Sequence, residues 1–286
     1  MPRLALAGTE LNYERAGEGE PLLLIQGMTA NLLAWGRPFS SLLEESFDVI
    51  SFDNRGMGLS SPVREEFSIA EMAADTAALL DELGVERAHV LGISMGGMIA
   101  QELALAHPER LRSLTIGCSY CGGPGSQLMD PTDFQVLAEA MSSGDQDRVF
   151  RAMYELNLSP GFRAEESRYA EFAEMAAARP APRRVIGFQL QAIAAHDTSA
   201  RLPNLEIPTL VIHGTVDRIL GYPNGPLIAS LIPGARLETL EDVGHLFWWE
   251  QPERSAELIR EHALAPAQPP GLAQPAGSSR PSTLRT

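Results

Sequence analysis

Lysine is absent from this sequence: all 22 basic residues among its 286 are arginine. The absence excludes enzymes that need a lysine Schiff base, a lysine-bound pyridoxal phosphate or the lysine of a phosphate-binding loop. Basic residues are also few against 37 acidic ones, so that the formal net charge is −15. Such a charge repels phosphate backbones and anionic lipid surfaces, and we therefore expect neither a nucleic-acid nor a membrane partner.

Cysteines and long apolar runs are scarce as well. Cys118 and Cys121 are the two cysteines, and although they have Cys-x-x-Cys spacing, two thiols neither build a disulfide framework nor complete a zinc site. The longest apolar runs, such as residues 21–25 and 88–93, are too short to span a bilayer. The first eight residues lack the profile of a signal peptide. We expect a cytoplasmic protein.

Short, nearly continuous apolar segments alternate with amphipathic ones along the chain. Six segments are typical of strands buried on both faces: residues 21–26, 47–52, 88–93, 111–116, 207–213 and, more weakly, 237–240. Between two of them, a segment opens with Ser68 and Glu71 as a capping pair and closes at Gly84, which predicts a helix over residues 68–83. This alternation predicts an α/β fold with a mostly parallel, doubly wound sheet.

The stretch from residue 122 to residue 201 interrupts the alternation, because it has helical periodicity and no strand of the earlier kind. We predict that residues 1–121 and 202–264 form the α/β core and that residues 122–201 form an inserted helical cap. The last segment, residues 265–286, holds five prolines and no acidic residue. That composition predicts a disordered tail.

The string Gly92-Ile-Ser-Met-Gly-Gly97 carries the most chemical information. It follows a predicted buried strand and precedes a helical pattern, which is the context in which Gly-x-Ser-x-Gly forms a nucleophile elbow. The sharp turn strains the backbone of the serine, and the nearby glycines let strand and helix approach each other. A glycine-rich turn with an incidental serine is the alternative. We identify Ser94 as the candidate nucleophile.

A serine hydroxyl needs a base that takes its proton, and the sequence holds six histidines. His245 follows the last predicted strand, on a loop that contains Gly244, and we identify it as the candidate base. His196 lies at the end of the predicted cap and is either a helix-end residue or a substrate contact. The remaining histidines fall in strands or near helix ends, where packing or capping explains them: His89, His107, His213 and His262.

The base in turn needs an acceptor that fixes the tautomer of its imidazole. Asp217 follows the preceding predicted strand and is the candidate, with Asp242 as the alternative. Because the carboxyl ends of parallel strands meet at one edge of a sheet, we expect Ser94, Asp217 and His245 to converge there.

A developing oxyanion needs two N–H donors. We expect them from the backbone of Met95, directly after the serine, and of Met28, on the loop that follows the first predicted buried strand. Four residues are candidates for the substrate pocket, although ordinary core packing is the alternative for the large side chains: Gly27, Trp35, Met129 and Trp248.

These motifs resemble those of the α/β-hydrolase superfamily over about residues 11–261. The likeness rests on the elbow and on Gln26-Gly-Met28, Phe52-Asp-Asn-Arg-Gly-Met-Gly-Leu-Ser60, His107-Pro-Glu-Arg110, His213-Gly-Thr-Val-Asp217 and residues 244–253. The order Ser, Asp, His along the chain is also the one found in this superfamily. Within it, the chain is similar to carboxylesterases, 3-oxoadipate enol-lactonases and cofactor-free haloperoxidase-like enzymes. The resemblance implies a core hydrolase domain with a helical cap, no metal and no cofactor. The chain departs from the family pattern at Gln26, where many members carry His.

Together these features predict a serine hydrolase that cleaves carboxylic esters or lactones of small, mainly apolar molecules through an acyl-enzyme on Ser94. A lactonase similar to the enol-lactonases is an alternative. It would take an anionic substrate and need an arginine in its pocket, for which the predicted cap offers Arg163, Arg168, Arg179, Arg183 and Arg184. A noncatalytic ligand-binding protein on the same fold is a third interpretation. The sequence leaves substrate selectivity and oligomeric state open.

Overall fold

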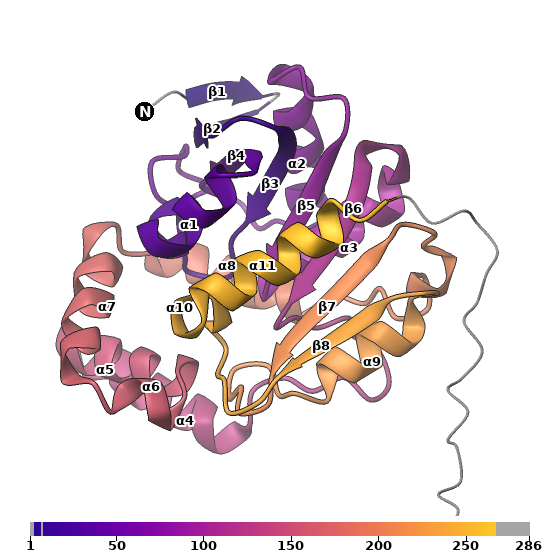
Figure 1. The fold of residues 1–286 in the computed structure, drawn as a ribbon. Coiled ribbons are helices and arrows are strands. Elements are labelled where there is room, and N and C mark those ends of the chain that lie inside the picture. The colour runs from indigo at the N-terminus through magenta and orange to yellow at the C-terminus, as the bar shows by residue number, and fades with distance from the viewer. Residues whose placement is uncertain (1–2, 7, 267–286) are drawn as a thin grey trace, which may run out of the picture.

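One eight-stranded sheet is the centre of the computed structural model, which describes residues 3–6 and 8–266 (Figure 1). Its strands are β1 (Arg3–Leu6), β2 (Thr9–Ala16), β3 (Glu20–Ile25), β4 (Phe47–Phe52), β5 (Ala88–Ile93), β6 (Leu111–Gly117), β7 (Thr209–Gly214) and β8 (Arg236–Leu240). They lie in the order β1-β2-β4-β3-β5-β6-β7-β8. The pairs β1·β2 and β2·β4 are antiparallel and the other five are parallel. The predicted α/β fold with a mostly parallel sheet is confirmed.

The two antiparallel strands at the edge, β1 and β2, were not expected from the sequence. Their residues are mostly exposed or half-buried, and in β2 only Leu11 and Asn12 are buried. Because these strands are only partly buried, they do not need the continuous apolar run that identified the six inner strands.

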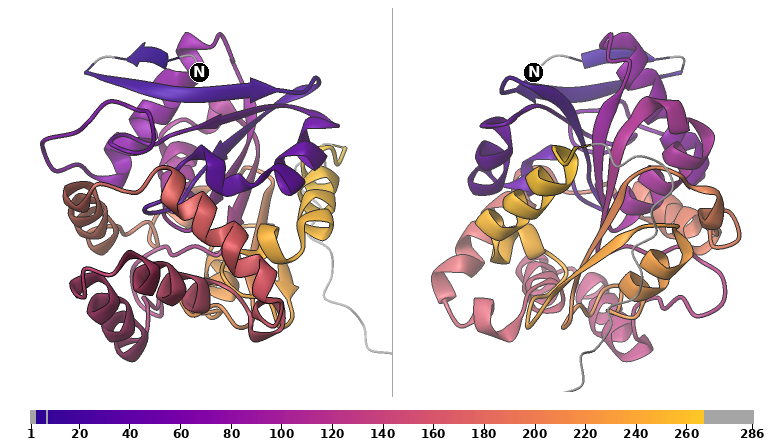
Figure 2. Two further views of the ribbon diagram at one scale, coloured as in Figure 1. Left: turned by 90° about the vertical axis from the view of Figure 1, so that its left-hand side faces the viewer. Right: turned by 45° about the vertical axis from the view of Figure 1, so that its right-hand side comes forward.

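Helices cover both faces of the sheet, as the right-hand view of Figure 2 shows. One face carries α2 (Ile69–Glu82), α3 (Met95–Ala106) and α9 (Asn224–Leu231), and the other carries α1 (Arg37–Glu44), α10 (Phe247–Glu250) and α11 (Pro252–Ala263). In β3, Leu23 packs toward the first layer while Leu22 and Leu24 pack toward the second. Burial on both faces explains why this strand reads as a continuous apolar run.

The chain between β6 and β7 forms helices and no strand. These are α4 (Pro131–Ser142), α5 (Gln146–Asn157), α6 (Pro160–Arg163), α7 (Glu166–Ala178) and α8 (Arg183–Ala194). In Figure 1, α4 to α7 lie beyond the carboxyl ends of β5 and β7. We refer to residues 122–201 as the cap segment; that it forms a domain of its own stays a prediction. Of the tail predicted over residues 265–286, residues 267–286 lie outside the described part of the chain.

Across residues 3–6 and 8–266, none of the helices combines the length and the apolar character that crossing a membrane requires.

Candidate active site

Ser94 occupies a sharp turn between β5 and α3. Its φ of 54° and ψ of −124° lie outside the regions that L-residues ordinarily adopt. A Cβ added at Gly92 would stand 2.2 Å from the carbonyl oxygen of Gly96, and one added at Gly96 would stand 2.1 Å from that of Ile25. Both glycines are therefore required by close packing of the strand, the helix and the neighbouring β3. The turn holds Ser94 in its strained conformation, partly exposed at the edge of the sheet.

His245 and Asp217 form a buried pair on the loops after β8 and β7. Nδ1 of His245 donates to Oδ2 of Asp217 at 2.7 Å. The other carboxylate oxygen accepts from the amides of Ile219 and Leu220 at 2.8 and 3.0 Å. With Nδ1 protonated and donating, Nε2 of the neutral imidazole is left as a proton acceptor, which is the tautomer a general base requires.

The electrostatics keep this carboxyl group ionised. Burial by itself raises the pKa of Asp217, but the charge of His245 and the hydrogen bonds from His213 and His245 outweigh it. The pKa of Asp217 is held well below the usual range for aspartate. The carboxylate can therefore stabilise a positive charge on the imidazole at neutral pH.

The Asp217–His245 pair and Ser94 lie at the same edge of the sheet, joined through the end of β6. Sγ of Cys118 lies within 4.8 Å of ligand atoms of both Asp217 and His245. The next residue, Ser119, donates from its hydroxyl to the carbonyl oxygen of Ser94 at 2.7 Å. The structure thus joins Asp217 and His245 directly and places Ser94 at the same edge of the sheet; that the three act together as a triad stays a prediction.

The alternatives for the acid and the base have other roles. Asp242 is exposed, and its backbone N–H donates to Oγ1 of Thr215. His89 bonds Ser113 and Glu20, and His262 bonds backbone carbonyls at the opposite end of the sheet. His196 is buried at the end of the cap segment, where neither ring nitrogen has a hydrogen-bond partner.

The loop after β3 lies against the serine. A Cβ added at Gly27 would stand 2.9 Å from Cβ and 3.4 Å from Oγ of Ser94. Met28 follows, half-buried, and Met95 is the first residue of α3. The loop thus passes beside the nucleophile at the position expected for an oxyanion hole. That the amides of Met28 and Met95 stabilise an oxyanion stays a prediction.

The predicted pocket residues lie in different surroundings. Trp35 and Trp248 are each 2% exposed and pack against each other with ring centroids 5.5 Å apart, inside the core layer that faces α1 and α11. Nε1 of Trp248 donates to the carbonyl oxygen of Ala34 at 3.1 Å. Met129 is half-buried in the loop before α4. Contact of these side chains with a substrate stays a prediction.

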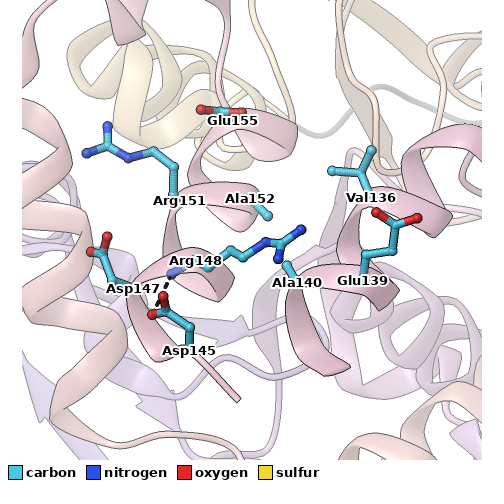
Figure 3. A pocket seen from close by; sticks show the side chains of 9 residues that line it. All are labelled: Val136, Glu139, Ala140, Asp145, Asp147, Arg148, Arg151, Ala152 and Glu155. Atoms are coloured by element: carbon cyan, nitrogen blue, oxygen red, sulfur yellow. Dashed lines mark hydrogen bonds between the residues drawn. The ribbon is translucent and has the colours of Figure 1, made fainter. Parts of the chain in front are cut away.

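A separate pocket of about 390 Å³ lies in the cap segment, between α4 and α5 (Figure 3). Charged groups of both signs line it together with three apolar residues: Val136, Glu139, Ala140, Asp145, Asp147, Arg148, Arg151, Ala152 and Glu155. None of the predicted site residues is among them. This pocket therefore belongs to the surface of the cap segment and not to the Ser94 site.

Two neighbours of Asp217 were missed as site residues in the sequence. Nε2 of the fully buried His213 lies 3.2 Å from Oδ2 of Asp217 and also bonds the carbonyl oxygen of Leu220 at 2.7 Å. The spacing of four residues in His213-Gly-Thr-Val-Asp217 was the available signal. For Cys118 there was no such signal, since nothing in the sequence connects it with residue 217.

Cys118 adjoins the acid but has a poorly reactive thiol. Burial, and then the charge of Asp217, raise the pKa of Cys118 well above that of a free cysteine. Cys118, Asp217 and His245 could together offer three ligand atoms to a metal ion. A metal there would have to replace the proton between Asp217 and His245, and would therefore compete with the base that Ser94 needs.

The comparisons with known proteins agree with this fold. A family model described as the alpha/beta hydrolase fold matches residues 20–252. The chain is 33% identical to "Putative carbamate hydrolase RutD" of Azorhizobium caulinodans, over 91% of this chain and 97% of that protein. It is 28% identical to 3-oxoadipate enol-lactonase 2 of Acinetobacter baylyi, over 85% and 89%. The crystal structure of a hydrolase from Pseudomonas aeruginosa superimposes with a TM-score of 0.80, at 29% identity, over 92% and 98%.

A mostly parallel sheet with a strained serine and a buried His–Asp pair at its carboxyl edge defines a hydrolase-like protein. The chain belongs to the α/β-hydrolase family, in the branch that includes enol-lactonases and non-heme haloperoxidase-like proteins. The superfamily that the sequence motifs resemble is thereby confirmed.

Proposed function

We propose that this protein is a serine hydrolase that cleaves carboxylic esters or lactones of small, mainly apolar molecules. The observation that supports it most is the 2.7 Å hydrogen bond from His245 to the buried Asp217, at the same edge of the sheet as the strained Ser94. A noncatalytic binding protein has no need of an imidazole oriented by a buried carboxylate beside a strained serine.

The reaction has two acyl-transfer steps. In the first, Nε2 of His245 takes the hydroxyl proton of Ser94 while Oγ attacks the carbonyl carbon, and the imidazolium then gives that proton to the leaving alcohol. In the second, His245 deprotonates a water molecule that attacks the acyl-enzyme. The acid is released and the proton returns to Ser94. Asp217 stays ionised throughout and stabilises the imidazolium.

The oxyanion of each tetrahedral intermediate accepts hydrogen bonds from the backbone of Met28 and Met95. The close approach of Gly27 to Ser94 supports this assignment, because a side chain there would occupy the space beside the nucleophile. Losing one such donor costs about a hundredfold to a thousandfold in rate.

The cap segment covers the carboxyl edge and selects the substrate, with Gly27, Trp35, Met129 and Trp248 as pocket residues. The cytoplasmic location expected from the sequence stays a prediction.

A fluorophosphonate probe and a panel of p-nitrophenyl esters of graded acyl length test the proposal. We expect the probe to add its mass to the peptide that contains Ser94, and Ser94→Ala to abolish both labelling and ester cleavage. A well-folded wild-type protein that neither labels nor hydrolyses would favour the noncatalytic binding protein.

Lactones are the second arm of the same experiment, because a relative in the same branch is an enol-lactonase. Ser94 can form an acyl-enzyme from either substrate: an ester releases a separate alcohol, whereas the alcohol of an opened lactone stays attached to the acyl group, and hydrolysis then releases a single hydroxy acid. If a lactone that bears a carboxylate is hydrolysed faster than neutral esters, this would indicate an anionic substrate and an arginine in the pocket.

A further inference from the structure

We propose that the cap segment is a structural part of the catalytic centre, and that Glu250 is a positioning residue that ties it to the loop of His245. The inference rests on the proposed function for its kinetic consequences. The contacts that carry it are independent of any substrate.

The last residue of α5 holds the backbone of the histidine. The carbonyl oxygen of Asn157 accepts from the amides of His245 and Leu246 at 2.8 and 3.2 Å. A carbonyl at the end of a helix has no partner within that helix and is free to accept elsewhere. The end of α5 is thus used to bind the loop that carries the catalytic base.

Glu250 makes the second connection. Its Oε1 accepts from the amide of Gly244, directly before the histidine, at 2.8 Å, and from the amide of Ser159 at 2.9 Å. Its Oε2 accepts from the hydroxyl of Ser159. One carboxylate of α10 therefore joins the residue before His245 to the turn between α5 and α6 of the cap segment.

The fit between loop and cap segment is close. A Cβ added at Gly244 would stand 2.7 Å from the carbonyl oxygen of Asn157, 2.9 Å from Oε1 of Glu250 and 3.0 Å from the amide nitrogen of Ser159. The aromatic ring of Trp249 also packs edge-on against Phe172 of α7, with centroids 6.0 Å apart. The histidine loop can keep these contacts only while the cap segment stays in place.

The cap segment also reaches the loop on the other side of the nucleophile. Oε1 of Gln189, a fully buried residue of α8, accepts from the amide of Thr29 at 3.0 Å. Thr29 directly follows the proposed oxyanion donor Met28 and has a φ of 64°. An acceptor at this point holds the loop in a conformation that a threonine adopts only at a cost.

These contacts predict an effect on turnover more than on substrate binding. A displacement of about 1 Å between reacting groups can lower a rate about a hundredfold. Asp217 orients the imidazole ring, and the backbone contacts of residues 244–246 hold the loop that carries it. Loosening them lowers kcat, whereas a residue that merely lined the pocket would change KM.

The first experiment compares Glu250→Ala with Glu250→Gln. We expect Glu250→Ala to lower kcat about 10- to 100-fold with KM within about twofold, because two buried amides lose their acceptor. Glu250→Gln keeps a carbonyl oxygen for both amides, so we expect kcat within about threefold of the wild type. Glu253→Ala, which removes an exposed carboxylate nearby, is the control and should leave kcat unchanged.

The second variant tests the other loop. Gln189→Met keeps the volume of the side chain but removes the acceptor of the Thr29 amide, and we expect kcat to fall about tenfold at unchanged KM. Gln191→Met, at an exposed position of the same helix, is the matched control. A rise in KM alone would make Gln189 a substrate contact and overturn its positioning role.

Hydrogen exchange separates this inference from the proposed function. We expect the amides of residues 244–246 to exchange faster in Glu250→Ala than in the wild type, whether or not any ester is hydrolysed. Unchanged exchange, or an unchanged kcat in an enzyme that hydrolyses esters, would overturn the positioning role of Glu250. A wild type that neither hydrolyses esters nor labels with the probe would contradict the proposed function while exchange still reported on the contacts.

Discussion

The nucleophile side and the histidine side of the candidate site are built in different ways. Ser94 is held by steric contacts close to it in the fold, since Gly92 and Gly96 leave no room for a side chain. His245 is held by hydrogen bonds that it donates to Asp217, 28 residues earlier, and to the carbonyl oxygen of Asn157 in the cap segment. Glycines that make room for close packing can be recognised in a short sequence motif. Hydrogen bonds between distant segments depend instead on how those segments pack in the folded protein.

Substitutions on the two sides of the site should therefore affect different properties of the protein. On the nucleophile side, changes at the glycines should affect stability, because backbone atoms cannot move out of the way. On the histidine side, the loss of an acceptor should affect turnover, because the loop has other contacts that keep it folded.

Removing the nucleophile should have the largest effect. We expect Ser94→Ala to lower kcat by about 10⁴-fold or more, since the remaining binding groups supply only a small part of the rate enhancement. The midpoint of thermal unfolding should stay within a few degrees of the wild type. Ester cleavage near the wild-type rate in this variant would contradict the assignment of Ser94.

Removing the charge of Asp217 should have the second-largest effect on kcat. We expect Asp217→Asn to lower kcat about 10²- to 10⁴-fold, because an amide no longer stabilises the imidazolium and can favour the wrong tautomer. Asp242→Asn, at the exposed alternative position, should keep kcat within about threefold of the wild type. Steady-state kinetics on one ester decide between them, and the opposite ranking would make Asp242 the acid.

A glycine of the elbow should affect stability instead. We expect Gly92→Ala to lower the free energy of unfolding by roughly 3 kcal/mol, because its Cβ would meet the carbonyl oxygen of Gly96. Gly187 lies in α8 with nothing within 4 Å of an added Cβ. Gly187→Ala should therefore raise the free energy of unfolding by about 0.5–1 kcal/mol. Urea unfolding measures the free energy of unfolding of both variants. Equal changes in the two variants would contradict the steric role of Gly92.

The last expected effect is a pH dependence of stability that arises from two histidines: His196, buried at the end of the cap segment, and the half-buried His262 of α11. Burial lowers the pKa of His196 to about 4 and that of His262 to about 4. As the pH falls from 6.5 toward 4, the unfolded chain binds protons that the folded chain does not, so the free energy of unfolding falls. The slope is at most about 1.4 kcal/mol per pH unit for each histidine.

A variant tests the contribution of His196 to this slope. His196→Phe should flatten the dependence of stability on pH between 6.5 and 4, because neither ring nitrogen has a hydrogen bond to lose. Glu102, Asp197 and Arg201 surround the ring and modulate the shift. An unaltered slope in His196→Phe would show that His196 is not the group that titrates.

The inner strands and the elbow were predictable because their signals are local. The segments at residues 47–52 and 88–93 were predicted with the bounds that the structure has, since burial on both faces leaves a continuous apolar run. The capping box of Ser68 and Glu71 forms as expected. The antiparallel strands β1 and β2 and the short helices α1 and α6 were not predicted, because they are too short or too polar to show a period.

The sequence alone determined the fold class, the elbow and the order of Ser94, Asp217 and His245, since these follow from burial, glycine sterics and the parallel sheet. The folded structure was needed to show that Asp217 and not Asp242 accepts from His245. It was also needed to show that His213 and Cys118 adjoin the acid. The contacts of Asn157 and Glu250 with the histidine loop are visible only there as well. Those contacts join residues far apart in the chain. Their distances depend on how the loops at the edge of the sheet pack against the cap segment, which no local sequence pattern determines.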